Sequence, residues 1–110
     1  AVHLQEMIAG MTALNKIGET LGAIGTVTAV TDVTGFGLLG HLIEMAEGAG
    51  LTATLHYSQL PVAEGAREYL AKRIVPDATY RNWNSYSEKV SFEKGVKVER
   101  TISNSLVSYW

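Results

Sequence analysis

Apolar residues recur at steps of three and four near the start of the chain. The stripe consists of Leu4, Met7, Ile8, Met11, Leu14, Ile17 and Leu21. Because positions three and four apart share one face of a helix, the pattern predicts an amphipathic helix over residues 3–21. Gly22 and Gly25 predict its end, since glycine commonly terminates helices.

Two segments typical of β-strands flank a second helical pattern. The Val- and Thr-rich string "TVTAVTDV" predicts a buried strand over about residues 26–33. The alternation in "LTATLHY" predicts a half-buried strand over residues 51–57. Between them, apolar residues over 38–49 return at helical spacing, and the glycines of "EGAG" predict the end of that helix.

The second half of the chain is less regular. Pro61 predicts the start of a short helix, because its missing N–H costs nothing at a first helical position. From residue 75 to 88 the periodicity fails, which predicts an ordered loop. Apolar pairs on both sides of "EKG" predict a hairpin over residues 90–98.

This order of elements favours an α/β (α+β) fold in which helices pack on one mixed β-sheet. At 110 residues the chain corresponds to one small domain or to part of a larger one. It opens "AVHLQEM", without an initiating Met, so we expect residues 1–110 to be a single, partial domain.

Composition narrows the possible partners. Nine Lys and Arg against eleven Asp and Glu give a net charge of −2, so neither nucleic acid nor an anionic membrane is expected as a partner. The chain has no cysteine, which excludes disulfides, zinc thiolates and thiol catalysis within it. No apolar run approaches the length of a membrane helix. A cytoplasmic location is consistent with these features.

The string "TDVTGFGLLGH" combines an acidic residue, a glycine turn and the start of a helix. Asp32 lies at the carboxyl end of the predicted buried strand, where α/β proteins usually bind ligands, and its carboxylate suits Mg²⁺. Gly35 and Gly37 let the backbone approach a ligand closely. The helix start favours phosphate. A nucleotide–metal site would use all of these features.

A purely structural interpretation accounts for the same residues. Asp or Thr before a helix is a common N-cap, and the glycines could only provide the bend. The chain has no G-x-x-x-x-G-K-[ST] motif. His41 either faces a ligand or occupies an ordinary polar position. Arg81 is a candidate anion contact and Asn82 a candidate hydrogen-bonding residue, unless aromatic side chains alone hold the "RNWNSY" loop. Spacing alone leaves these alternatives open.

The string "AVTDVTGFGLLGHLIEMAEGAG" resembles the opening of the C-terminal domain in the selenophosphate synthetase (selenide, water dikinase) family. This family is a branch of the aminoimidazole ribonucleotide synthetase-like superfamily. The likeness extends back through "MTALNK" and forward through "LPVAEGAREY", "IVPDATYRNWNSY" and "VSFEKG". It therefore covers roughly residues 7–95.

The resemblance implies a homodimeric enzyme that forms selenophosphate, AMP and phosphate from ATP, selenide and water. In that family Mg²⁺ ions bridge the ATP phosphates, and the aspartate of the matching motif joins the Mg²⁺ ligands. That position is Asp32 here, with Thr34 and Gly35 in the vicinity of the phosphates. On this basis Asp32 is expected to be a metal ligand rather than a helix cap.

The chain also departs from the family pattern. The family's catalytic cysteine or selenocysteine, its partner lysine and its glycine-rich loop belong to an N-terminal ATP-binding domain that is absent from this chain. The family's "DPQTSGG" stretch is missing, and "ERTISNSLVSYW" does not align. We therefore expect no catalytic residue in these 110 residues, no activity from the chain alone, and an exposed sheet edge.

Two other functions remain on sequence grounds. One is a non-catalytic α/β module for dimerisation or binding, in which Asp32 is only a cap. The other is a related ATP-dependent enzyme of the superfamily that acts on a purine precursor or a carbamoyl group. The extended "GFGLLGH" string argues against the second of these.

Overall fold

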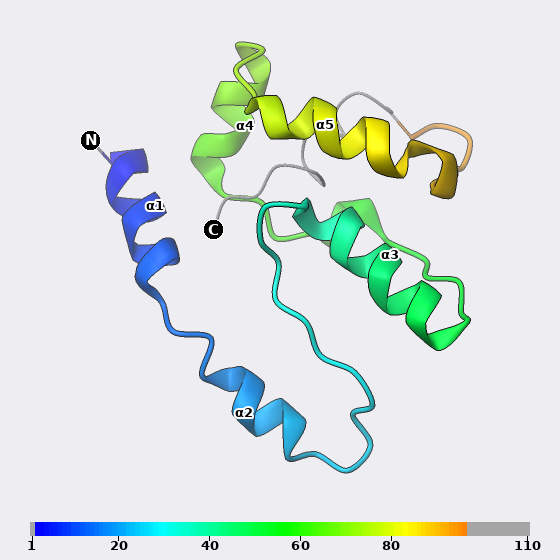
Figure 1. Cartoon of the computed structure of the whole chain (residues 1–110). Coiled ribbons are helices and arrows are strands. Elements are labelled where there is room, and N and C mark those ends of the chain that lie inside the picture. Colours follow the sequence, from blue (N-terminus) through cyan, green and yellow to red (C-terminus); the bar gives the residue numbers. More distant parts are fainter. Residues whose placement is uncertain (1, 97–110) are drawn as a thin grey trace.

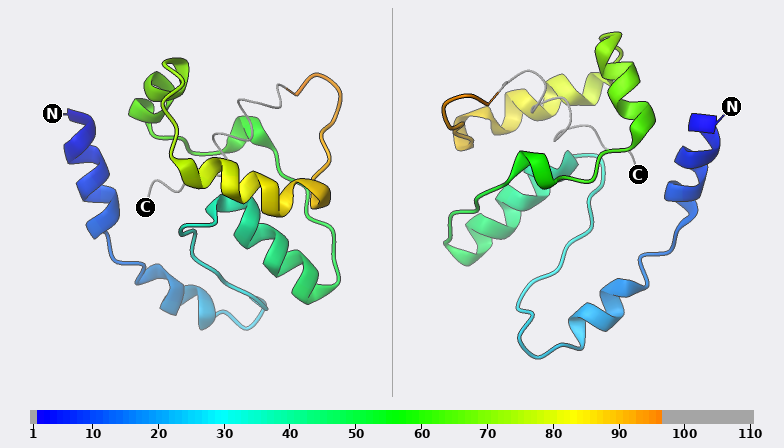
Figure 2. Two further views of the ribbon diagram at one scale, coloured as in Figure 1. Left: turned by 45° about the horizontal axis from the view of Figure 1, so that its top comes forward. Right: turned by 180° about the vertical axis from the view of Figure 1, so that it is seen from behind.

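The protein is seen in a computed structural model that describes residues 2–96. Within them the elements are α1 (Val2–Thr12), α2 (Ile17–Gly22), α3 (Gly37–Ala49), η1 (Tyr57–Gln59), α4 (Glu64–Ala71), α5 (Asp77–Tyr86) and η2 (Ser87–Lys89), where η denotes a 3₁₀-helix. In Figure 1, α1 and α2 lie along one side of the molecule, and a long irregular segment joins them to α3. Helices α3 and α5 pack against each other and lie side by side in both figures (Figures 1 and 2).

The predicted α/β fold is wrong, because residues 2–96 contain helices and no β-strand. Residues 26–33 and 51–56 have no regular secondary structure, and Tyr57 already begins η1. A strand is stable only when a neighbouring strand pairs with its backbone N–H and C=O groups. Neither segment finds such a partner within the described residues. Val30 and Leu51 accordingly remain 49% and 72% exposed.

Only part of the predicted hairpin lies within the residues that the structure describes. Residues 90–96 form no strand, and the amide of Val96 donates to the carbonyl of Glu93 across a turn at 3.3 Å. Positions 97 and 98 lie outside the described residues. For the part that the structure describes, the hairpin prediction is wrong.

The single helix predicted over residues 3–21 is two helices. The hydroxyl of Thr12 donates back to the carbonyl of Ile8 at 2.8 Å, at the last residue of α1. A new turn begins where the amide of Gly18 donates to the carbonyl of Asn15 at 3.0 Å. A Thr side chain that bonds to the preceding helical turn competes with the backbone hydrogen bonds, so α1 ends at Thr12 although the apolar stripe continues through Leu14.

The loop predicted over residues 75–88 is wrong, because α5 and η2 occupy most of it. Pro76 precedes the helix in an extended conformation, and Asp77 places a negative charge in the first turn, where the helix dipole favours it. The buried face of α5 is formed by Thr79 and Asn82. These side chains are polar, so a search for apolar periodicity passes over the helix.

The helix predicted from residue 38 is confirmed as α3. Its end is set by Gly50, which has φ +67°, a conformation that glycine adopts without strain. The short helix predicted to start at Pro61 exists as α4, but it begins three residues later at Glu64. Arg73 closes that helix in the same left-handed conformation, at φ +58°.

Few side chains are fully covered. Among the described residues the buried apolar side chains are Leu39 and Ala66, and the buried polar ones are His41, Thr79 and Asn82. In contrast, the apolar stripe that runs from α1 to α2 is largely exposed, with Leu14, in the segment between the two helices, at 87% and Ile17 at 67%. Burial is therefore concentrated on α3, α4 and α5, and it is unusually polar.

Candidate magnesium–phosphate site

Residues 34–37 form a tight turn that leads directly into α3. The amide of Gly37 donates to the carbonyl of Thr34 at 2.9 Å. Phe36 has φ −84° and ψ −4°, as expected for the third residue of a type I turn, and glycine is favoured at the fourth. Gly37 has φ +70°, which a side chain rarely tolerates. We call residues 34–37 the TGFG turn.

Asn82 of α5 holds this turn from a distant part of the sequence. Its Nδ2 atom donates to the carbonyl of Gly35 at 2.9 Å, across 47 positions of the chain. Asn82 is 6% exposed. Sequence reasoning expected Asn82 to stabilise its own loop, whereas the structure shows that it bonds to the TGFG turn.

His41 of α3 holds the turn from the other side. Its Nε2 atom lies 3.0 Å from the Thr34 hydroxyl oxygen. Its Nδ1 atom lies 3.4 Å from a carboxylate oxygen of Glu44, one helical turn further along. His41 is buried, and its imidazole takes part in the packing of the turn rather than standing on the helix surface.

Aromatic rings and a glycine complete the packing around the turn. The ring of Phe36 contacts the imidazole of His41 with centroids 5.7 Å apart, and the ring of Tyr86 with centroids 6.4 Å apart. Gly40 lies beneath both aromatic side chains. A Cβ atom there would come within 2.8 Å of the Phe36 Cβ and 2.9 Å of the Tyr86 ring. Only glycine leaves space for this contact.

Asp32 lies two residues before the turn and is exposed. The cap interpretation is wrong for this residue, because the N-cap of α3 is Phe36 and no side chain makes a cap hydrogen bond there. The Thr34 hydroxyl meets His41 rather than an amide of the helix. The fold therefore does not use the Asp32 carboxylate as a cap.

The donor set fits a shared magnesium ligand rather than a complete metal centre. Over residues 2–96, no three or more His, Asp and Glu side chains come together in a way that could hold a metal ion. Asp32 offers one hard carboxylate donor. Mg²⁺ commonly takes one or two carboxylates and fills its remaining positions with phosphate oxygens and water. A single exposed carboxylate next to an open turn suits that role.

The other candidate residues do not join the turn through any contact that the structure records. Arg81 is exposed. Trp83 packs against Phe92, with ring centroids 6.0 Å apart. An anion contact by Arg81 therefore stays a prediction.

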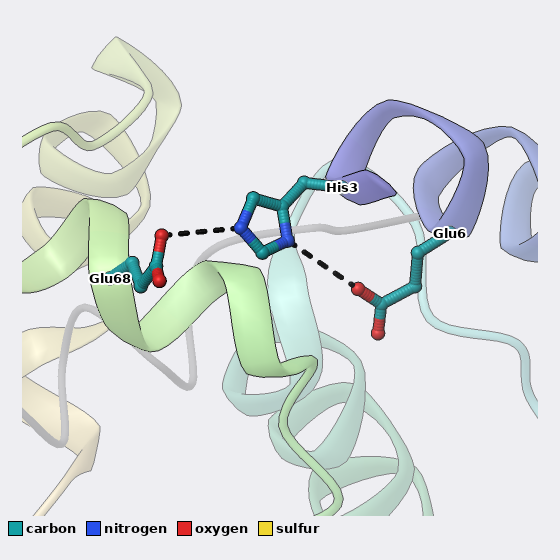
Figure 3. A network of polar contacts seen from close by, with 3 residues as sticks. All are labelled: His3, Glu6 and Glu68. Carbon is teal, nitrogen blue, oxygen red and sulfur yellow. Dashed lines mark hydrogen bonds and ion pairs between the residues drawn. The ribbon is translucent and has the colours of Figure 1, made fainter. Parts of the chain in front are cut away.

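His3 forms a separate polar contact that sequence reasoning missed. Figure 3 shows its ring between Glu6 of α1 and Glu68 of α4. The Nε2 atom lies 3.2 Å from the Glu68 carboxylate, and the Nδ1 atom lies 4.0 Å from that of Glu6. These side chains are partly exposed, so the contact joins α1 to α4 without forming an enclosed site.

Comparison with known proteins identifies the family to which the chain belongs. The profile of the family described as "AIR synthase related protein, C-terminal domain" matches residues 3–93. The chain belongs to this family. The resemblance inferred from "TDVTGFGLLGH" and its surroundings is thereby confirmed.

Similar members of the family are selenide, water dikinases. The Bordetella bronchiseptica protein is 49% identical over 81 residues, which cover 74% of this chain and 24% of that protein. The Pseudomonas putida protein is 51% identical over 81 residues, with the same shares. The Dechloromonas aromatica protein is 45% identical over 97 residues, which cover 88% of this chain and 28% of that protein. The chain thus spans about a quarter of the length of these curated relatives.

No helix among residues 2–96 has the length and apolar character that a membrane crossing requires.

Proposed function

We propose that the chain is the part of a selenide, water dikinase that contributes Asp32 to a magnesium–phosphate site. The enzyme would form selenophosphate, AMP and phosphate from ATP, selenide and water. The similarity to selenide, water dikinases over most of the chain supports the reaction. The observation that carries the site is the TGFG turn, to which the buried side chains of His41 and Asn82 bond. The Asp32 carboxylate is exposed and does not cap α3.

Each residue of the segment has a distinct role in this proposal. Asp32 provides one oxygen ligand to Mg²⁺. Thr34 and Gly35 lie in the vicinity of the phosphates, and the space next to Gly35 is open, since a Cβ there would meet nothing within 4 Å. The amides at the start of α3 have no side-chain cap, so they and the helix dipole favour a negative charge in front of the turn.

The remaining chemistry is assigned to residues outside this chain. Phosphoryl transfer depends on positioning and on neutralising charge with Mg²⁺ held across the phosphates. One carboxylate cannot hold that ion tightly, so further ligands and the catalytic residues would come from an N-terminal ATP-binding domain. A homodimer in the cytoplasm is part of the proposal. The 110 residues alone are expected to be inactive.

The test is Asp32→Asn in the enzyme made from the complete reading frame that encodes this chain. ATP with selenide and Mg²⁺ is followed by ³¹P NMR for selenophosphate and AMP. We expect the parent enzyme to form both products and the Asn variant to form neither while its unfolding temperature stays unchanged. Asp77→Asn is the matched control, because it makes the same chemical change on α5, and it should keep its activity.

Full activity in the Asp32→Asn variant would refute the site assignment. A parent enzyme that forms no selenophosphate would refute the reaction. ATP consumption that does not depend on selenide would instead point to the related superfamily enzymes that act on purine precursors.

The second candidate function is a non-catalytic binding module. The observation in its favour is the exposed apolar stripe along α1, α2 and the segment between them, which includes Leu14 and Ile17. Exposed apolar patches of this kind mark surfaces that bind other proteins. In that case Leu14→Glu would abolish binding to the partner protein, and Asp32→Asn would have no effect.

A further inference from the structure

Two of the three buried polar side chains among the described residues contact one short segment, the TGFG turn. Of the three, His41 contacts the Thr34 hydroxyl and Asn82 bonds to the Gly35 carbonyl. Burying a polar side chain costs free energy unless it gains a hydrogen bond. Here both side chains obtain that bond from the same turn. A turn used only as a connection would not require two buried polar contacts from two different helices.

The orientation of the His41 ring follows from its neighbours. The Nδ1 atom makes no hydrogen bond within the described residues, but the Glu44 carboxylate oxygen 3.4 Å away can only accept, so we assign the N–H to Nδ1. Nε2 is then an acceptor, and the Thr34 hydroxyl donates its proton to it. The hydroxyl oxygen consequently has only lone pairs left for its exposed side. It therefore presents an acceptor that suits Mg²⁺ or a water bound to it, rather than a phosphate oxygen.

Asn82 fixes the direction of the Gly35 carbonyl in a similar way. An amide nitrogen can only donate, so the bond holds this carbonyl oxygen toward Asn82 on α5. A Gly35 carbonyl oxygen turned toward a bound phosphate would repel it. The two side chains thus act on neighbouring groups of one turn. His41 orients the Thr34 hydroxyl, and Asn82 holds the Gly35 carbonyl.

We propose that His41 and Asn82 are positioning residues, which hold the TGFG turn in the geometry that accepts a magnesium–phosphate group beside Asp32. This inference rests on the proposed function of Asp32. Neither residue touches the substrate, since both act through the turn. Outer contacts of this kind typically change metal affinity or activity by about 10–100-fold when they are removed.

The experiment compares single substitutions in the enzyme made from the complete reading frame. Thr34→Val removes the hydroxyl at an exposed position without opening the core, and Thr34→Ser restores it. His41→Leu and Asn82→Ser remove the two buried contacts, and His41→Gln keeps an acceptor for Thr34. Thr79→Val is the matched control, because Thr79 is buried on the same helix as Asn82 and its hydroxyl makes no hydrogen bond.

Two measurements separate positioning from a merely structural role. The first is the Mg²⁺ dependence of kcat and of the KM for ATP. The second is binding of Mn²⁺, as a substitute for Mg²⁺, by electron paramagnetic resonance with a non-hydrolysable ATP analogue. We expect His41→Leu, Asn82→Ser and Thr34→Val to weaken Mn²⁺ binding and lower kcat by about 10–100-fold. Thr34→Ser, His41→Gln and Thr79→Val should stay within about threefold of the parent, a margin well inside that expected loss.

The double variant His41→Leu/Thr34→Val provides a further check. If His41 acts through the Thr34 hydroxyl, the double variant should be no less active than the less active of the two single variants. The reason is that the effects of substitutions at contacting residues do not add. Multiplicative losses would overturn that part of the proposal.

The failure of this inference can be told apart from failure of the proposed function. If Asp32→Asn abolishes Mn²⁺ binding but folded Thr34→Val and Asn82→Ser enzymes bind it within twofold of the parent, positioning is refuted and the metal ligand stands. If Asp32→Asn binds Mn²⁺ normally, the proposed function itself fails. Should the His41 or Asn82 variants not fold, the exposed Thr34→Val and Thr34→Ser pair decides the question.

Discussion

Gly40 tests whether α3 and α5 pack as closely as the structure shows. Replacing it with alanine adds one methyl group, 2.8 Å from the Phe36 Cβ and 2.9 Å from a ring carbon of Tyr86. Ordinary contacts between carbon atoms lie near 3.5–4.0 Å, so at least one neighbour must move. The Tyr86 ring can shift at modest cost. The Phe36 Cβ is attached directly to the backbone of the TGFG turn and cannot swing aside.

The sign of the effect depends on two opposing terms. Alanine is favoured over glycine inside a helix by about 1 kcal/mol. Overpacking typically costs about 1–3 kcal/mol, and the fixed position of the Phe36 Cβ places this case in the upper part of that range. We therefore expect Gly40→Ala to lower the free energy of unfolding around α3 by roughly 1 kcal/mol.

Gly48 provides the matched control in the same helix. A Cβ there would meet nothing within 4 Å, so Gly48→Ala should gain about 0.4–1 kcal/mol. The two substitutions are chemically identical and should have opposite signs. Amide hydrogen exchange of α3 and α5 measures the local opening free energy of both variants. Similar stabilisation by both would show that the close contact between Gly40, Phe36 and Tyr86 does not exist in solution.

The other helix contacts give two further predictions. Arg73→Gly should stabilise the end of α4 by about 0.5–1 kcal/mol, because Arg73 has φ +58° and glycine adopts that conformation without a Cβ clash; a lower urea midpoint in the variant would contradict this. Gly65→Ala should displace His3, whose Nδ1 atom would lie 2.6 Å from the new Cβ, and separate it from Glu68. The backbone amides of α1 should then exchange faster than in the parent protein, while those of α3 exchange at the parent rate. An unchanged exchange rate in α1 would mean that His3 does not hold α1 to α4.

Hydrophobic patterning correctly predicted α3, where the apolar spacing and the terminal glycine agree with the tertiary packing. Helix α3 has apolar residues at helical spacing and a glycine where a left-handed residue ends the helix, so its existence and its end were both predictable. The glycine turn before α3 was also recognisable from "TDVTGFG". The family follows from the same string, and comparison with known proteins confirms it.

The interpretation failed where stability depends on a distant partner. The Val- and Thr-rich segment over residues 26–33 has the composition of a strand, but strand formation needs a second edge that residues 2–96 do not provide. Helix α5 was missed because its buried face is polar, and burial of Asn82 becomes favourable only when the TGFG turn supplies its hydrogen-bond partner.

For the candidate site, the sequence by itself determined the local chemistry: an aspartate, a threonine and glycines arranged so that a carboxylate precedes an open turn and a helix start. Only the tertiary structure decided how that turn is held. The bond from Asn82 to Gly35 joins residues 47 positions apart, and the burial of His41 depends on packing around Phe36. Periodicity describes neighbours along the chain, whereas the free energy of a buried polar contact depends on groups that only the fold brings together.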